Sequence, residues 1–101
     1  MKRHPNLPWF DLEPDLAWYT DPGHGWLAVR LSRYPDAESF ASGFSFFISA
    51  NGTRFALLEE DEDAGRFLAA HPELSGDAIH AVHIDGAAGE QLRSLPRGSA
   101  K

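Results

Sequence analysis

The sequence feature that most constrains the fold is the pair Asn51-Gly52, which lies between two runs of β-favouring residues. Asn-Gly is the preferred pair for a two-residue type I′ turn, because both positions of that turn need a positive φ angle. The flanking runs, residues 44–50 and 53–58, then pair antiparallel in one register. The expected facing pairs are Ala50 with Thr53, Ser49 with Arg54, Ile48 with Phe55, Phe47 with Ala56, Phe46 with Leu57, Ser45 with Leu58 and Phe44 with Glu59.

One face of this hairpin is apolar throughout. Alternate residues of a strand point to the same side, and the residues on this side form a predicted core face: Phe44, Phe46, Ile48, Phe55 and Leu57. The register set by the turn and the pattern of side chains agree, which supports the hairpin.

A second hairpin is predicted around a glycine-rich turn. Residues 16–20 and 26–31 read as its strands. Pro22 presets the backbone for the second position of a turn, and Gly23 supplies a positive φ angle at the third. These two residues favour a type II turn.

Helical segments and a last strand complete the chain. Residues 34–43 predict a short helix, and residues 64–71 predict another, because apolar residues recur there at helical spacing and Pro72 ends the run. Residues 79–84 are expected to form the last strand. Asp85 is expected to cap a final helical turn.

Together these elements predict an α+β fold. We expect one small domain with a mostly antiparallel sheet of about five strands, made of two hairpins plus the last strand. Two or three short helices are expected to pack on one face of the sheet. Parallel pairing is allowed at one place, between residues 53–58 and 79–84, because the connection between them is long enough for a helical crossover.

The expected domain covers residues 16–95. Residues 1–15 are interpreted as an N-terminal arm whose prolines interrupt regular structure. Residues 96–101 are interpreted as a flexible C-terminal tail. Three apolar side chains are expected to hold the arm on the domain: Trp9, Phe10 and Leu12.

Composition and charge exclude several classes of function. The 101 residues include no cysteine, which rules out disulfides, thiolate nucleophiles and cysteine-ligated metal centres. Fifteen Asp and Glu against nine Lys and Arg give a net charge of −6, which argues against direct nucleic-acid binding. No apolar run approaches the roughly 18 residues of a membrane span, and residues 1–10 lack the apolar core of a signal peptide. We therefore expect a cytoplasmic protein without membrane contact.

Metal, nucleophile and glycosylation motifs find little support. His80 and His83 point to opposite faces of the predicted strand, and no histidines stand at helical ligand spacing, so no metal site and no cofactor are predicted. No serine lies in a Gly-x-Ser-x-Gly elbow. The Asn51-Gly52-Thr53 glycosylation pattern is better explained by the hairpin turn.

An acidic run precedes the helix predicted at residues 64–71. It consists of Glu59, Glu60, Asp61, Glu62 and Asp63. One or two carboxylates at a helix start are favoured by the helix dipole, whereas further ones repel each other. The run is therefore a solvated helix start, or a surface that binds a basic partner and mimics nucleic-acid phosphates, or a site for a hard cation such as Ca²⁺. The cation is disfavoured because the Asp-x-Asp-x-Asp-Gly loop pattern is missing.

The glycine-rich turn is a second candidate site. Asp21 stands three residues before His24, and Gly23 and Gly25 flank the histidine. An exposed histidine beside a carboxylate can act as a general base or a pH switch. The alternative is that the glycines make the turn and His24 has no role beyond it. The Gly23-x-Gly25 spacing is no phosphate-binding fingerprint, because a strand follows it instead of a helix.

An outward set of aromatic residues is expected, with Trp26 and Phe47 on the sheet face opposite the core, plus Trp18 and Tyr19. Trp26 and Phe47, together with Ala56 and Leu58, would form an exposed apolar patch of the kind found at interfaces. In the alternative interpretation the N-terminal arm covers this face.

Two motifs in this order resemble a group of small uncharacterised proteins from bacteriophages and proteobacterial mobile elements. The motifs are DPGHGWL at residues 21–27 and LEEDEDAGRFL at residues 58–68, the latter similar to a recurring LEEDxDxxxFL segment. The resemblance covers about residues 18–95 and departs from the group at residues 31–44. It implies an accessory gene whose product acts in the cytoplasm of a bacterial host, and it implies no catalytic residue.

The leading functional hypothesis is a non-enzymatic protein that binds a basic protein partner. The predicted contact residues are the acidic run together with Trp26 and Phe47. By analogy with small acidic anti-CRISPR proteins, the partner would be a nucleic-acid-handling defence complex of the host. The alternatives are an acid–base enzyme or hydrolase that uses His24 with Asp21, and a structural homodimer held by the exposed sheet face.

Overall fold

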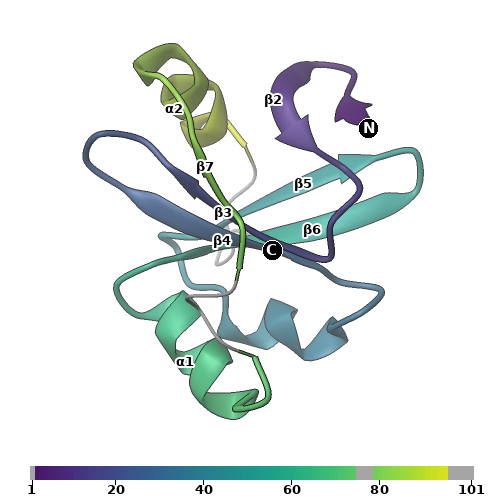
Figure 1. Cartoon of the computed structure of the whole chain (residues 1–101), viewed down its shortest axis with the longest axis vertical. Helices are drawn as coiled ribbons and strands as arrows, with labels where there is room; N and C mark the ends of the chain where they lie inside the picture. Colours follow the sequence, from purple (N-terminus) through teal and green to yellow (C-terminus); the bar gives the residue numbers. More distant parts are fainter. Residues whose placement is uncertain (1, 75–78, 96–101) are drawn as a thin grey trace.

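A five-stranded sheet forms the centre of the computed structural model, which describes residues 2–74 and 79–95 (Figure 1). The strands lie in the order β5-β6-β4-β3-β7, and only β3 and β7 pair in parallel. The predicted α+β class with a mostly antiparallel sheet is confirmed. The strand bounds are β3 Leu16–Thr20, β4 Gly25–Arg30, β5 Phe46–Ala50, β6 Thr53–Glu59 and β7 Ala81–His83.

The β5–β6 hairpin has the predicted turn and register. Asn51 and Gly52 have φ angles of 53° and 79°, as a type I′ turn requires. Five of the expected facing pairs are confirmed: Ala50–Thr53, Ser49–Arg54, Ile48–Phe55, Phe47–Ala56 and Phe46–Leu57.

The hairpin ladder ends at Phe46, before the last two predicted pairs. The hydroxyl of Ser45 accepts a hydrogen bond from the backbone N–H of Glu59 at 3.0 Å, so a side chain replaces the strand partner there. Phe44 consequently lies outside the core with 69% of its surface exposed. Its predicted place on the core face is wrong.

The parallel pairing forms with a different strand from the one expected. Trp18 of β3 faces Ala81 of β7, and Thr20 faces His83. β6 cannot receive β7 because β4 and β5 already occupy both of its edges. The last strand therefore adds to the open edge of β3.

Helices lie on both faces of the sheet, which corrects the prediction that they pack on one face (Figure 1). Helix α1 (Asp63–Ala70) and the 3₁₀ helix η1 (Pro35–Phe40) cover one face. Helix α2 (Gly86–Arg93) and the N-terminal strand β2 (Leu7–Asp11) cover the other. The five residues from Gly25 to Val29 are all buried, and such a continuous buried run requires cover on both sides.

Trp26 and Phe47 are buried on opposite faces, so the predicted exposed apolar patch does not form. They are 3% and 7% exposed, and Tyr19, also predicted to point outward, is 0% exposed. Ala56 faces both Phe47 and Val29, which places Val29 on the face of Phe47. Trp26, three residues from Val29 on the same strand, points to the other side, under the N-terminal arm and α2.

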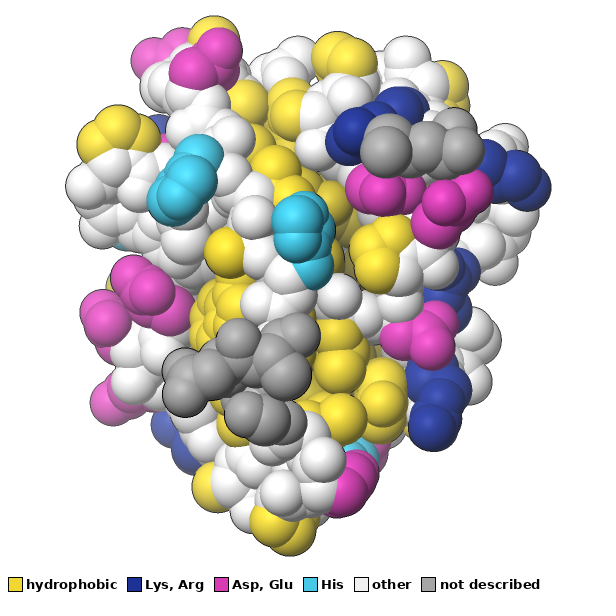
Figure 2. Space-filling model, viewed as in Figure 1, with side chains coloured by type: hydrophobic (Ala, Val, Ile, Leu, Met, Phe, Trp, Pro, Cys, Tyr) yellow, Lys and Arg dark blue, Asp and Glu magenta, His cyan; other side chains and the backbone are white. Residues whose placement is uncertain are grey.

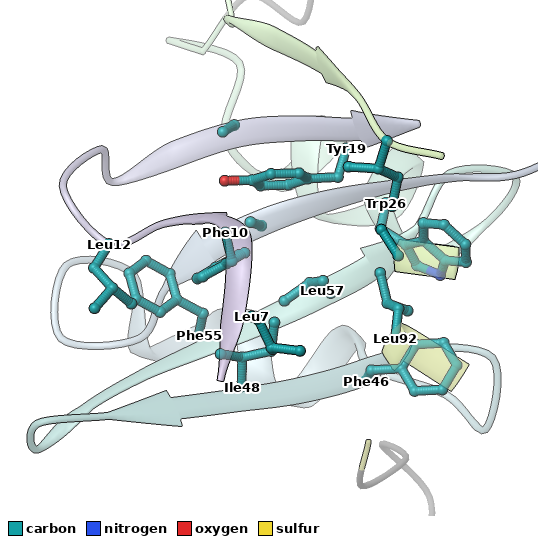
Figure 3. Packing of buried hydrophobic residues seen from close by; sticks show 14 residues of the cluster. Leu7, Phe10, Leu12, Tyr19, Trp26, Phe46, Ile48, Phe55, Leu57 and Leu92 are labelled. Carbon is teal, nitrogen blue, oxygen red and sulfur yellow. The ribbon is translucent and has the colours of Figure 1, made fainter. Parts of the chain in front are cut away.

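The N-terminal arm contains regular structure in spite of its prolines. β2 pairs antiparallel with β1 (Arg3–His4) in a two-stranded sheet. β2 has a single strand partner, so it tolerates the missing N–H of Pro8. Phe10 holds the arm on the domain, because its ring packs 5.1 Å from both Tyr19 and Phe55 (Figure 3). The predicted tail at residues 96–101 lies outside the described residues.

Candidate functional site

The acidic segment, defined here as residues 59–62, is shaped by its own first carboxylate. Glu59 ends β6, and its two carboxylate oxygens accept hydrogen bonds from the backbone N–H groups of Asp61 at 3.0 Å and Glu62 at 3.2 Å. These bonds bend the chain toward α1 and leave the side chains of Glu60, Asp61 and Glu62 exposed. Acidic side chains gather at the left edge of the molecule in Figure 2, where β6 leads into α1 in Figure 1.

Asp63 does not belong to this exposed surface, which corrects its prediction as a contact residue. The side chain is 1% exposed, and its carboxylate accepts hydrogen bonds from the Ser42 backbone and from the hydroxyls of Ser42 and Ser45. Arg66 donates to it at 2.8 Å. Burial raises the pKa of Asp63, but these hydrogen bonds and the Arg66 charge outweigh burial and hold the pKa below its usual value. Asp63 is a structural carboxylate that joins α1 to the start of β5.

The glycine-rich turn is held by the side chain of Asp21. Its Oδ1 accepts hydrogen bonds from the backbone N–H groups of Gly23 at 2.9 Å and His24 at 2.7 Å. Asp21 also donates its own N–H to the His24 carbonyl. Gly23 has no positive φ angle, so the predicted type II turn is wrong, and an aspartate-capped turn takes its place.

Helix α2 reaches this turn through Arg93. Its Nη2 donates to Asp21 Oδ2 at 3.2 Å and lies 3.0 Å from Nδ1 of His24. Burial of the Asp21 side chain, which is 5% exposed, raises the pKa of its carboxyl group. The two backbone hydrogen bonds and the nearby His24 and Arg93 side chains outweigh this effect, so the net pKa lies below its usual value. Gly89 permits this contact, because a Cβ atom there would lie 2.6 Å from Asp21 Oδ2.

Sequence reasoning missed Arg93 and Gly89. They stand four residues apart in the helix that Asp85 caps, so a shared helix face could have been predicted. Nothing in the sequence indicates that this face meets the turn at residues 21–25.

The turn and the acidic segment adjoin one hollow. The hollow has a volume of about 270 Å³, and we refer to it as the His24 hollow. The backbone N–H of Glu60 donates to the Gly25 carbonyl at 3.0 Å, so the two segments predicted as separate candidates are in direct contact. The lining residues are His24, Trp26, Phe44, Phe46, Glu59, Asp61 and Arg93.

Aromatic rings make up much of the His24 hollow. The imidazole of His24 stacks on the indole of Trp26 with centroids 5.7 Å apart and planes inclined by 21°. Phe46 meets the same indole edge to face at 6.1 Å. Phe44 completes the wall and is the one large hydrophobic residue of the described chain that is exposed.

Across residues 2–74 and 79–95, no three His, Asp or Glu side chains cluster as metal ligands. Over the same ranges, no helix has the length and apolar character needed to cross a bilayer. No protein-family model, curated protein or solved structure matches the chain.

Proposed function

We propose that the protein acts without catalysis, by binding a protein partner that presents a basic surface to the acidic segment. The observation that carries this proposal is the exposure of three successive carboxylates: Glu60, Asp61 and Glu62. In the described part of the chain, Glu62 pairs with Arg66 at 3.7 Å, and neither Glu60 nor Asp61 has a cationic partner. Adjacent like charges repel, and a cationic surface relieves that repulsion.

The proposed contact surface differs from the one expected from the sequence. Asp63 and Phe47 are buried, so they leave the surface, and Trp26, which is 3% exposed, contributes only as a lining residue of the His24 hollow. Phe44 joins it, because its exposed ring borders a second hollow with Glu59, Asp61 and Glu62.

We extend the proposal to the setting implied by the two sequence motifs, an accessory protein of a phage or mobile element. In that setting the partner is a host defence complex that handles nucleic acid, and the protein inhibits it as an anti-CRISPR protein would. The support is the surface chemistry: a complex that binds nucleic acid carries a basic groove, and an acidic protein can occupy it.

The test compares two variants with equal charge loss. The first carries Glu60→Gln, Asp61→Asn and Glu62→Gln, which leaves the Glu59 bend intact. The control carries Glu13→Gln, Glu38→Gln and Glu90→Gln, away from the segment. A partner captured from host extract is identified, purified and titrated with each protein. We expect about tenfold or greater loss of affinity for the first variant alone. Equal affinity of the two variants would discard the acidic segment as the contact.

An acid–base enzyme that uses His24 with Asp21 is a second candidate, favoured by the His24 hollow beside the imidazole. The hydrogen bonds weaken it. Nδ1 of His24 lies 3.0 Å from Arg93 Nη2 and 3.4 Å from Asp21 Oδ1, so this nitrogen is already engaged by the protein's own side chains. Hydrolysis of p-nitrophenyl acetate above the buffer rate, lost in His24→Gln, would support the enzyme.

The third hypothesis, a homodimer held by an exposed sheet face, lacks the exposed face that it requires. Both faces are covered by elements of the same chain, and the apolar residues named for that interface are buried.

A further inference from the structure

The His24 hollow combines aromatic walls with negative charge. Two of its lining residues, Glu59 and Asp61, carry carboxylates. Four others carry aromatic rings: His24, Trp26, Phe44 and Phe46. Arg93 is the one guanidinium in the lining. Its charge is already matched by Asp21, which sits behind it at 3.2 Å. The hollow therefore presents an excess of negative charge to a ligand.

Two observations indicate that the hollow is built for a ligand and is more than an acidic surface. Phe44 keeps 69% of its surface in water although the next two residues, Ser45 and Phe46, are buried, and its ring lines both this hollow and the second one. Nε1 of Trp26 is buried and has no hydrogen-bond acceptor in the described residues. Figure 3 shows this nitrogen on the edge of the indole that faces Phe46, another lining residue.

We propose that the His24 hollow receives one arginine side chain of the basic partner, a step that rests on the proposed function. The guanidinium lies against the Phe44 ring and pairs with Asp61 and Glu59. A guanidinium is preferred to an ammonium because it is planar, stacks on aromatic rings and is weakly hydrated. The peptide carbonyl beside the arginine supplies the acceptor that Trp26 Nε1 lacks.

The acidic segment and the hollow then act at different distances from the partner. Glu60 and Glu62, which are exposed and do not line the hollow, attract the basic surface over several ångströms. The hollow fixes the register of the complex by accepting a single side chain. Charge-based attraction tolerates many partners, whereas one ring-lined hollow selects for arginine at one position.

The direct test uses three short blocked peptides, Gly-Arg-Gly, Gly-Lys-Gly and Gly-citrulline-Gly, titrated into the full chain. Citrulline keeps the planar end group and removes its charge. Two-dimensional NMR follows the indole N–H signals, of which the chain has three. We expect the arginine peptide to shift the Trp26 indole signal saturably, the lysine peptide to bind several-fold more weakly, and the citrulline peptide to leave the signal in place. Equal shifts with arginine and citrulline would overturn the proposal.

Two variants locate the site, each with a matched control. Phe44→Ala removes an exposed ring and should leave the fold intact while it weakens arginine-peptide binding by about tenfold. Asp61→Asn should weaken binding similarly, and Glu90→Gln, a carboxylate of α2 outside the hollow, should not change it. Unchanged peptide affinity in both Phe44→Ala and Asp61→Asn contradicts the hollow as the arginine site.

The same variants separate this inference from the proposed function. If Phe44→Ala binds the purified partner as the native protein does, while Glu60→Gln with Glu62→Gln does not, the acidic segment remains the contact and the arginine site is wrong. If neither variant changes partner affinity, both proposals fail. Loss of partner binding in both variants supports both.

Discussion

The backbone N–H of Glu60 donates to the carbonyl oxygen of Gly25 across 3.0 Å and joins the acidic segment to the glycine-rich turn. A Cβ atom on Gly25 would lie 2.6 Å from Oε2 of Glu60, so only glycine allows the carboxylate to rest there. Arg93, at the end of α2, donates a hydrogen bond to Asp21 and so holds the same turn. Two segments 35 residues apart in sequence thereby border a single surface.

Gly89→Ala should destabilise the protein by about 1–3 kcal/mol, because the new methyl group would lie 2.6 Å from Asp21 Oδ2. That oxygen cannot withdraw easily, since Asp21 is held by two backbone N–H groups and by Arg93. Urea unfolding measures the change. Gly65→Ala is the matched control, since its Cβ meets nothing within 4 Å, and it should stabilise α1 by about 0.5–1 kcal/mol. Equal effects of the two changes would show that the approach of α2 to the turn is not tight.

Much of the fold could be predicted from local signals. The Asn51-Gly52 turn set the register of β5 and β6, and Asp85 capped α2 as expected. Local signals do not show which face of a sheet a later helix covers. The alternation of residues 26–31 therefore predicts an outward Trp26, although α2 and the arm bury it. The sequence likewise groups Asp63 with its acidic neighbours, because its serine partners, Ser42 and Ser45, come from about twenty residues earlier in the chain.

His71 should make stability depend on pH. Its imidazole lies 2.7 Å from Asp36 of η1 and 3.1 Å from Glu73. The hydrogen bond to Asp36 is the main cause that raises the pKa of His71, and Glu73 adds to it. Burial lowers the pKa, but by less than the carboxylates raise it. A raised folded pKa gives stability that is complete below the unfolded value of about 6.5 and is lost as the pH rises through the folded pKa. Urea unfolding across that range should show the decline.

The control for this prediction is His71→Gln, which keeps a side chain that can hydrogen-bond and removes the titration. Its stability should be lower than that of the native protein in acid and should vary less across the same pH range. An identical pH profile in both proteins would contradict the role of the Asp36–His71 pair.

Asp63→Ala should destabilise the protein by about 1–3 kcal/mol, because the buried Ser45 hydroxyl and the half-buried Ser42 hydroxyl lose their acceptor and Arg66 loses its ion pair. The lowered pKa of Asp63 adds a pH dependence. Its contribution is complete above the unfolded pKa of about 3.9 and is lost as the pH falls through the lower folded value. Acid unfolding of the native protein should therefore be steeper than that of the variant, and equal slopes would count against this assignment.

The triple variant Glu60→Gln, Asp61→Asn, Glu62→Gln should leave the folded protein at least as stable as the native chain. The three side chains are exposed, and removing adjacent like charges relieves repulsion that salt would otherwise screen. The melting temperature should rise at low ionic strength, and the difference should shrink as salt is added. This result would show that the carboxylates are retained at a cost to stability, as expected for a binding surface. A marked fall in melting temperature would instead make the segment part of the structural framework, and loss of partner binding in that variant would then no longer identify the contact.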